Sequence, residues 1–301
     1  MEAQSAGYEH SKWKGTTGGT PWMQRSLVHI LGAIDQRVVY AFLWIIIPFY
    51  MLFAHKAYLA QYCFFRQRFN QGIMLSFWHV FMNNITFGKI IVDRFASYGG
   101  RKFKFELDGY DIWKETDSES DGFMQVSSHI GNYELAGYSL RSENKLFNAL
   151  VFFGETETVM NNRNKSFTPN NIRMIPVSGD MSHIFTLNNA LSLGEIVSMP
   201  GDRMFGSQKY IIHRFLGADA KFPMGPYSLA TARQCKMLAV FVMKKDYQTY
   251  YIRVRRLSDG GAVKKADQIR NLSASFVSEL ESIVREYPTQ WFNYYDFWSM
   301  S

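Results

Sequence analysis

Residues 123–134 have the sequence FMQVSSHIGNYE, and they indicate the architecture of the chain. The first six include Phe123, Met124 and Val126 and predict a buried β-strand, while the residues that follow predict a turn leading into a helix. A strand followed directly by a helix is typical of a largely parallel sheet covered by helices. In such sheets, sites form beyond the carboxyl ends of the strands. His129 and Glu134 follow the predicted strand at its carboxyl end, so they are candidates for a functional site.

The same alternation continues from about residue 100 to the end of the chain. Strands are predicted at FKFEL (103–107), FMQVSS (123–128), LFNALVFF (146–153), RMIPVS (173–178), EIVSMP (195–200), MLAVFVMK (237–244) and TYYIRVRRL (249–257). Helices are predicted near 132–142, 155–164, 181–193, 225–235 and 264–287. Strands that are apolar throughout indicate a sheet buried on both faces. We therefore expect an α/β fold over residues 100–301, with a mostly parallel mixed sheet flanked by helices.

Residues 1–99 are expected to form an N-terminal helical membrane-associating region. Val38 to Ala54 are 17 consecutive uncharged, mostly apolar residues, interrupted by Pro48. This length is at the lower edge of what spans a bilayer, so three interpretations stay open: a buried core helix, a single span, or a helix lying in the interface. We favour the interfacial helix. Residues 72–87 predict a second helix, amphipathic or buried.

The composition is that of a globular protein, with 47% hydrophobic and 20% charged residues. The aromatic share of 16% suits a bulky core, and it equally suits a protein that sits at a bilayer interface or holds acyl chains. A net charge of +7 favours anionic lipid headgroups or an acidic carrier protein. Nucleic acid is not an expected partner, because the sequence has neither zinc-finger spacing nor an RNA-binding signature.

Cysteine usage and the first residues indicate a compartment. Cys63 and Cys235 have no C-x-x-C spacing, which predicts neither a disulfide framework nor a zinc site. The first 20 residues are polar and lack the apolar core of a secretory signal. The cytosolic side of a membrane is the simplest compartment that fits both observations.

His129 and Glu134 form an H-x4-E pair. Five residues of an ideal helix turn through roughly 500°, so within one helix the two side chains would not share a face. They can meet if His129 lies in the loop and Glu134 in the first helical turn. Glu134 would then orient the imidazole while His129 takes a proton from an attacking hydroxyl or amine. The spacing is loose by itself, and the alternative is a capping or core histidine beside a surface glutamate.

SHIGNYE (128–134) resembles the H-x4-D/E block of the lysophospholipid acyltransferase superfamily, and it looks most like that of the lipid A late acyltransferases, which transfer lauroyl and myristoyl groups. Further stretches resemble blocks of this group in the same order: WKGTTGGTPW (13–22), MPGDRMFGSQ (199–208), RFLGADAKFPMGPYSLA (214–230) and YPTQWFNYYDFW (287–298). Together they cover nearly the whole chain. One departure is that the P-V-x-P pattern common in the superfamily is absent from residues 236–240, KMLAV.

The resemblance implies direct transfer of a fatty acyl chain from an acyl carrier protein or coenzyme A thioester. The acceptor would be a hydroxyl or amine of a membrane lipid, with a lipid A precursor or related glycolipid first among the candidates. Neither a metal nor an organic cofactor would be required. The reaction would take place on the membrane surface, at the cytoplasmic face of a bacterial inner membrane.

The resemblance also implies roles for residues outside the histidine–glutamate pair. Arg203, beside Asp202, would hold an anionic headgroup or carrier phosphate, for which the planar fork of arginine is suited. The alternative for Arg203 is a surface ion pair. Gly131 and Asn132 are expected from their residue types to supply the turn and the helix cap after His129. Together with Asp202 and Arg203, they are the expected substrate-binding residues.

Two other classes of function remain open. One is a non-catalytic lipid-binding protein of the same fold, against which the intact His129 and Glu134 argue. The other is a hydrolase that releases the acyl group to water. The sequence has no G-x-S-x-G nucleophile elbow, which argues against a lipase-like hydrolase.

Overall fold

The computed structural model describes residues 34–53, 55–151, 170–178, 180–204 and 209–298, together with positions 22, 26, 31 and 161. Apart from positions 22 and 161, the block predicted at 13–22 and the helix predicted at 155–164 are therefore outside the described residues. Residues 205–208, the end of the block at 199–208, are also outside them.

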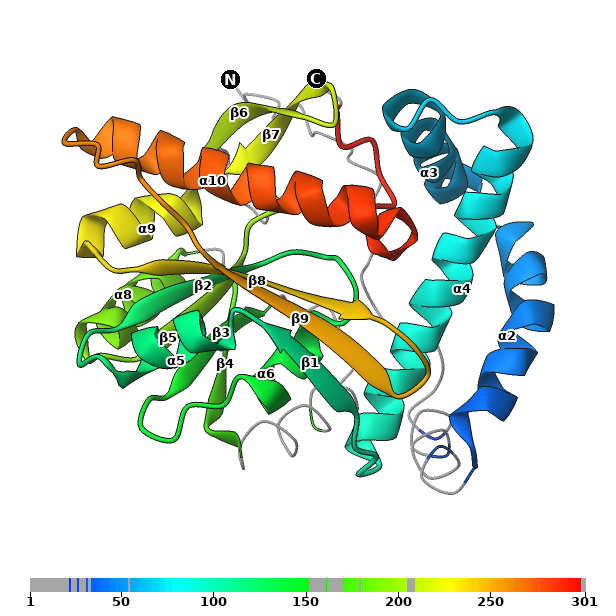
Figure 1. The fold of residues 1–301 in the computed structure, drawn as a ribbon, viewed down its shortest axis with the longest axis horizontal. Coiled ribbons are helices and arrows are strands. Elements are labelled where there is room, and N and C mark those ends of the chain that lie inside the picture. Colours follow the sequence, from blue (N-terminus) through cyan, green and yellow to red (C-terminus); the bar gives the residue numbers. More distant parts are fainter. Residues whose placement is uncertain are drawn as a thin grey trace, which may run out of the picture.

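A seven-stranded sheet forms the centre of the molecule, with strand order β1-β9-β8-β2-β5-β3-β4 (Figure 1). The strands are β1 (Lys104–Asp108), β2 (Phe123–Ser127), β3 (Phe147–Val151), β4 (Ile172–Pro176), β5 (Ile196–Pro200), β8 (Met237–Lys244) and β9 (Thr249–Arg256). Five of them, from β8 to β4 in the sheet order, are parallel, whereas β9 is antiparallel to β8 and β1 is parallel to β9. The predicted α/β fold with a mostly parallel mixed sheet is confirmed.

Helices cover both faces of this sheet, as Figure 1 shows. All eight residues of β8 are buried, because alternate side chains point to opposite faces and both faces are covered. On one face, Phe241 belongs to the core beneath α8 (Ser182–Ser192), α9 (Gly225–Arg233) and α10 (Lys265–Glu286). On the other face, Val240 belongs to the core beneath α5 (Tyr110–Ser118) and α6 (Ala136–Ser139).

A β-hairpin lies outside the main sheet and was not predicted. Its strands, β6 (Tyr210–Phe215) and β7 (Ala218–Pro223), pair antiparallel. The two residues that connect them, Leu216 and Gly217, both have positive φ, at 49° and 84°. A two-residue turn with two positive φ values normally carries Asn-Gly or Asp-Gly, so Leu-Gly gave no hairpin signal.

Of the residues described from position 34 onward, three helices precede the sheet and lie together along one side of it (Figure 1). They are α2 (Gln36–Met51), α3 (His55–Arg68) and α4 (Ile73–Tyr98). α2 begins where Asp35 accepts a hydrogen bond from the backbone N–H of Arg37 at 2.9 Å. The helix predicted over 72–87 is the first part of α4, and α3 was not predicted. Within the described residues, no helix combines the length and the hydropathy needed to pass through a bilayer.

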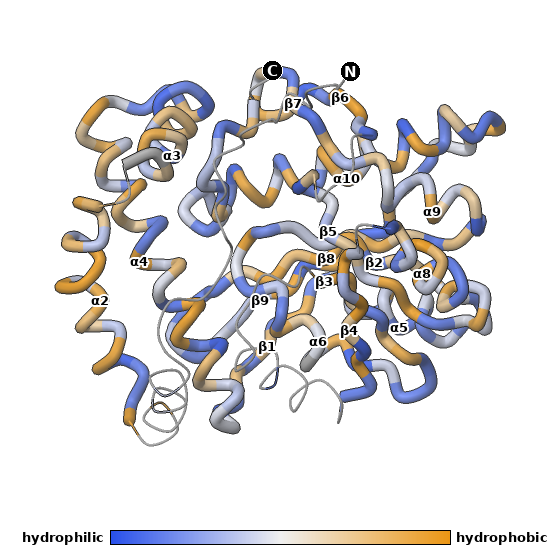
Figure 2. Tube along the Cα trace, turned by 180° about the vertical axis from the view of Figure 1, so that it is seen from behind, coloured by the Kyte–Doolittle hydropathy of each residue, from blue (hydrophilic) through white to orange (hydrophobic). Residues whose placement is uncertain are grey.

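α2 exposes apolar side chains along one stripe. Val38, Phe42, Ile45 and Phe49 recur at helical spacing and are 49–64% exposed. A fully buried core helix is therefore the wrong interpretation for this segment. Much of α2 is drawn in the hydrophobic colour in Figure 2. The exposed apolar residues of the three helices and the turn after α2 are named the apolar face: Val38, Phe42, Trp44, Ile45, Ile46, Phe49, Tyr50, Leu52, Phe53, Leu59, Ile73, Met74, Leu75, Phe77 and Trp78.

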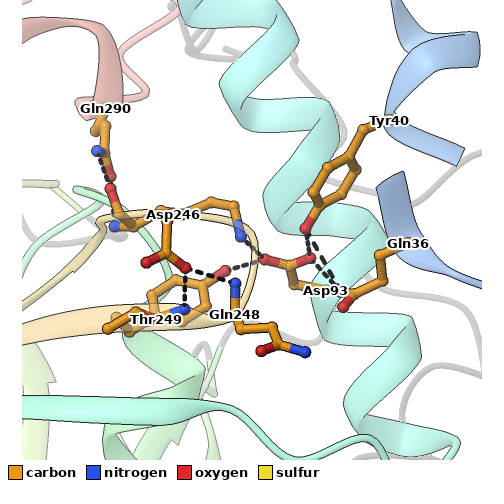
Figure 3. Close-up of polar contacts among 9 residues, drawn as sticks. Gln36, Tyr40, Asp93, Asp246, Gln248, Thr249 and Gln290 are labelled. Atoms are coloured by element: carbon orange, nitrogen blue, oxygen red, sulfur yellow. Dashed lines mark hydrogen bonds and ion pairs between the residues drawn. The ribbon is translucent and has the colours of Figure 1, made fainter. Parts of the chain in front are cut away.

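A buried polar cluster centred on Asp93 of α4 joins these helices to the sheet (Figure 3). From α2, Gln36 Nε2 donates to Asp93 Oδ1 at 2.7 Å, and the hydroxyl of Tyr40 donates to the same oxygen. From the sheet, Lys244 of β8 and Tyr250 of β9 donate to the other oxygen. Asp93 is fully buried, so the cluster supplies the partners that a buried carboxylate needs.

Candidate active site

The ends of β2 and β5 lie side by side. They are adjacent parallel strands, and Ser127 at the end of β2 is opposite Pro200 at the end of β5. The pairing continues one step further, because Gly201 N donates to Ser127 O at 2.8 Å. His129 and Asp202 come directly after these two strands. The carboxyl ends of the parallel strands thus bring together residues that are far apart in the sequence.

Both carboxylate oxygens of Asp202 contact His129. Oδ1 lies 2.8 Å from the ring nitrogen Nδ1, and Oδ2 accepts the backbone N–H of His129 at 2.8 Å. The indole Nε1 of Trp291 also donates to Oδ2, at 3.2 Å. The Asp202 side chain is 1% exposed, whereas that of His129 is 17% exposed. The carboxylate is therefore enclosed, while the imidazole can be reached from outside.

The surroundings favour a neutral imidazole. Burial lowers the pKa of His129, and the charge of Arg203 lowers it further, although Asp202 acts in the opposite direction. Burial by itself would raise the pKa of Asp202, but His129 and Arg203 together hold it below its usual value. An ionised Asp202 only accepts hydrogen bonds, so Nδ1 of His129 carries the hydrogen and Nε2 has the lone pair. This is the tautomer that a general base requires.

The loop after His129 is held by its backbone. Gly131 N donates to Gln290 O at 2.9 Å, and Phe292 N donates to His129 O at 3.0 Å. Gly131 has a φ of 57°, and a Cβ atom there would lie 1.8 Å from the carbonyl oxygen of Val242. Only glycine fits this position. Gly131 therefore shapes the site through its backbone, as a turn residue.

Glu134 lies in η1 (Tyr133–Leu135), the first helical turn after the loop, where the sequence places it. Its carboxylate contacts the hydroxyl of Tyr98 at 2.9 Å and Nε of Arg94 at 3.3 Å, and both of these residues belong to α4. Glu134 was expected to orient the imidazole, but the carboxylate on Nδ1 is that of Asp202. The reason is the strand order: β5 ends next to β2, whereas η1 carries Glu134 towards α4.

Asn132 is fully buried, and its side chain makes no helix-capping hydrogen bond. Its backbone is used instead, because Asn132 N donates to Val242 O at 2.8 Å and Leu135 N donates to Asn132 O at 3.0 Å. The expectation of a side-chain cap at Asn132 is therefore wrong.

Arg203 stands next to the His129–Asp202 pair. One of its nitrogens, Nη2, donates to the backbone oxygen of Phe292 at 2.6 Å. Its charge acts on both His129 and Asp202, which places the guanidinium within electrostatic range of the pair. Among the residues that the structure describes, no group of three or more His, Cys, Asp or Glu is placed to hold a metal ion.

Residues 82–298 match the family model of the bacterial lipid A biosynthesis acyltransferases. The chain belongs to this family. The match begins inside α4 and includes His129, Glu134, Asp202 and Arg203. The resemblance predicted from the ordered sequence blocks is thereby confirmed. As a lipid A acyltransferase family member, the chain is an acyltransferase, which implies an acyl thioester donor and a lipid acceptor.

A solved structure that resembles the chain is the 1-acyl-sn-glycerophosphate (LPA) acyltransferase PlsC from Thermotoga maritima. The two have a TM-score of 0.40 and 9% sequence identity, over 88% of this chain and 98% of that chain. No curated protein matches the sequence.

Several residues of this candidate site were not recognised from the sequence. Asp202 was assigned to substrate binding, whereas the structure places it on the imidazole of His129. Arg94 and Tyr98, which hold Glu134, were not singled out. Trp291 lies in the stretch YPTQWFNYYDFW (287–298), but its contact with Asp202 could be found only from the fold.

Proposed function

We propose that this acyltransferase moves a fatty acyl chain from an acyl carrier protein or coenzyme A thioester to a hydroxyl or amine of a membrane lipid. A lipid A precursor or a related glycolipid is the first acceptor to test. The observation that carries this proposal is the pairing of His129 with Asp202 at the carboxyl ends of β2 and β5. It joins a reachable imidazole to an enclosed carboxylate in a chain of the lipid A acyltransferase family.

In the proposed reaction, Nε2 of His129 takes the proton of the acceptor group as its oxygen or nitrogen attacks the thioester carbonyl carbon. The carbon–sulfur bond then breaks, and the imidazolium returns the proton to the leaving thiolate. Asp202 keeps the ring oriented through Nδ1 and stabilises the imidazolium that forms between the two steps. Every proton is accounted for by the acceptor, the imidazole and the thiol.

Arg203 is proposed to hold an anionic group of a substrate, either a headgroup phosphate or a phosphate of the thioester carrier. Its planar fork can bond two oxygens, and its position beside His129 would bring that group close to the base. Glu134 is proposed to act indirectly. Its contacts with Arg94 and Tyr98 would hold η1, and with it the loop after His129, against α4. No metal or organic cofactor enters this proposal.

An acyl carrier protein is the preferred donor in this proposal. Acyl carrier proteins are acidic, and the chain has a net charge of +7. Opposite net charges accelerate the encounter of two proteins and help to orient them. Coenzyme A is also anionic, so the choice between the two donors is made by the assay and not by charge alone.

We further propose that the apolar face rests on the cytoplasmic surface of a bacterial inner membrane. Monomeric soluble proteins rarely expose a contiguous apolar patch of this extent. Residues 38–53, which form most of α2 and the turn after it, include no charged side chain. Trp44, Trp78 and Tyr50 are among the exposed rings, and such amphipathic rings favour the headgroup level of a bilayer. The net positive charge would add attraction to anionic lipids.

Mass spectrometry of membrane lipids tests the transfer. Cells that express the native chain should contain a lipid that has gained the mass of an acyl group, and cells that express His129→Ala should not. His213→Gln is the matched control, because His213 lies on β6 and hydrogen-bonds Ser273 instead of Asp202. Equal acyl gain with the native chain and His129→Ala would overturn the role of His129. Deleting the gene in its native host and following loss of the acylated lipid then identifies the acceptor.

Flotation with vesicles of phosphatidylethanolamine and anionic phosphatidylglycerol tests the membrane contact. Phe42→Ser, Ile45→Ser and Phe49→Ser, combined, should abolish flotation. The control combines Phe185→Ser, Leu193→Ser and Val263→Ser, three apolar residues that are at least equally exposed but lie away from the apolar face. Loss of flotation in both variants, or in neither, would contradict the assignment.

A further inference from the structure

The chain near its C-terminus returns to the catalytic loop. Residues 289–292, here named the strap, follow α10 and run antiparallel to residues 129–131. Ile130 is bridged to Trp291, and the backbone hydrogen bonds from Gly131 to Gln290 and from Phe292 to His129 stand on either side of this bridge. The strap begins in the 3-10 helix η3 (Pro288–Gln290) and is held against the loop that carries His129 by one isolated β-bridge and two backbone hydrogen bonds.

The side chain of Trp291 reaches from the strap to Asp202. Its Nε1–H donates to Oδ2 of Asp202 at 3.2 Å, the same oxygen that accepts the backbone N–H of His129 at 2.8 Å. With two donors on Oδ2, the other oxygen, Oδ1, is directed at Nδ1 of His129. The rotation of the carboxylate about its own axis is thus fixed by three donors.

The indole is itself held firmly. Trp291 is buried, and its ring packs against Phe64 of α3 at 5.3 Å, Phe215 of β6 at 5.5 Å and Phe297 at 5.1 Å between centroids. Aromatic contacts at these distances restrict the orientation of a ring. The indole N–H therefore approaches Asp202 from a direction that the packing determines.

The strap is also anchored from the N-terminal helices. Asn83 of α4 donates from Nδ2 to the carbonyl oxygens of Thr289 at 3.1 Å and Trp291 at 3.0 Å. Gln61 of α3 in turn donates to Oδ1 of Asn83 at 2.7 Å. These amides are buried and linked to one another, which makes the position of the strap well defined.

We propose that Trp291 is a positioning residue for the transfer reaction: its indole N–H orients the carboxylate of Asp202 and limits how strongly that carboxylate attracts the imidazole of His129. This inference rests on the proposed role of His129 as the base. Trp291 needs no contact with either substrate. Its effect reaches the reaction through Asp202, by geometry and by charge.

The charge effect has a definite sign. A hydrogen-bond donor on Oδ2 takes up part of the negative charge of the carboxylate, so less of it acts on the protonated ring. Without the indole N–H, Asp202 would stabilise the imidazolium more strongly and the pKa of His129 would rise. The base would then be lost to protonation at a higher pH than in the native chain. A residue that only filled space in the core would not change this titration.

Trp291→Phe tests the proposal, because it removes the N–H donor and keeps an aromatic ring. The expected result is a fall of about tenfold in kcat with little change in KM. The acid limb of the kcat/KM profile should move to higher pH by about half a unit or more. Trp298→Phe is the matched control: Trp298 packs in the same cluster, but its Nε1 donates to the backbone oxygen of Phe215 at 3.1 Å.

The control variant should lose stability and keep the native pH profile. An unchanged acid limb in Trp291→Phe, or equal shifts in both variants, would overturn the proposal. If Trp291→Phe does not fold, an analogue of tryptophan with sulfur in place of the indole N–H, incorporated at position 291, makes the same test at the same volume. The base is tested separately: if His129→Ala still transfers acyl groups, the proposed function fails, whatever the tryptophan variants do.

Discussion

The imidazole of His129 and the carboxylate of Asp202 meet at 2.8 Å although 73 residues separate them in the sequence. A second contact, from the backbone N–H of His129 to the other carboxylate oxygen, is also 2.8 Å long. The carboxylate therefore fixes both the ring and the main chain that carries it. In the proposed reaction, Nε2 is the ring nitrogen that takes the proton of the acceptor.

Replacement of Asp202 by asparagine should nearly abolish turnover while changing the volume very little. An amide nitrogen facing Nδ1 would favour the other tautomer, and an amide has no negative charge with which to stabilise the imidazolium. We expect kcat to fall by about a hundredfold to ten-thousandfold, as measured by steady-state acyl transfer to the identified acceptor. Asp219→Asn, on the exposed side of the β6–β7 hairpin, is the control. Activity of Asp202→Asn within threefold of the native value would remove Asp202 from the mechanism.

Activity should persist at a pH slightly below the usual pKa of histidine. Burial, and then the charge of Arg203, lower the pKa of His129, so the ring stays neutral until the solution is more acidic than about pH 6.5. Since the neutral ring is the proposed base, the acid limb of kcat/KM should lie below that value.

Arg203→Met should move the acid limb of the kcat/KM profile to higher pH. Removing a positive charge beside the ring makes the imidazolium easier to form, which raises the pKa of His129. Arg214→Met, on the exposed side of β6, should leave the limb in place. A native acid limb above pH 6.5, or no difference between the two arginine variants, would contradict the assigned cause.

Glu134→Gln should destabilise the fold substantially. The ion pair between Glu134 and Arg94 is enclosed, with 6% and 10% of the side chains exposed, and the substitution leaves the guanidinium without its carboxylate. Losing one partner of a buried pair costs about 3–5 kcal/mol of unfolding free energy. Tyr98→Phe, which removes the hydroxyl contact with Glu134 and leaves the ion pair in place, should cost about 1 kcal/mol. Denaturant unfolding of the two variants in detergent makes the comparison, and equal losses would refute it.

Asp93 and Lys244 should show strong non-additivity. Their side chains are 0% and 7% exposed, so Asp93→Asn or Lys244→Met alone leaves a buried charge without its partner, at about 3–5 kcal/mol. The double variant should cost clearly less than the sum of the two. Thermal and denaturant unfolding supply the free energies. The exposed pair of Glu106 and Lys245 is the control, and Glu106→Gln should cost at most about 1 kcal/mol. Simple additivity at Asp93 and Lys244 would mean that the pair is not coupled.

The sheet could be predicted well because its strands carry local signals. Each predicted strand is present, with its ends shifted by at most two residues, since apolar runs such as that of β8 mark a strand buried on both faces. α5 was missed because it is short: it has nine residues, and only Trp113 and Thr116 of them are buried. The β6–β7 hairpin was missed because Leu216 occupies a turn position where asparagine is usual.

The site could be predicted only in part, for a related reason. His129 and Glu134 belong to one continuous stretch, so the motif and its resemblance identified them. The carboxylate that contacts the ring comes instead from β5, and only the strand order shows that β5 ends beside β2. The contact from Trp291 depends in addition on the chain returning to the loop after α10.

The buried Asp93 also limits how acyltransferases of this design can be recombined. The carboxylate is supplied by the helical region, and the ammonium of Lys244 that it neutralises is supplied by the sheet. A chimera that joins this sheet to a foreign helical region would contain Lys244 without its counter-ion. A chimera that joins these helices to a foreign sheet would contain a buried Asp93 without its ammonium partner. The helical region and the sheet are therefore exchangeable between proteins only as a matched unit.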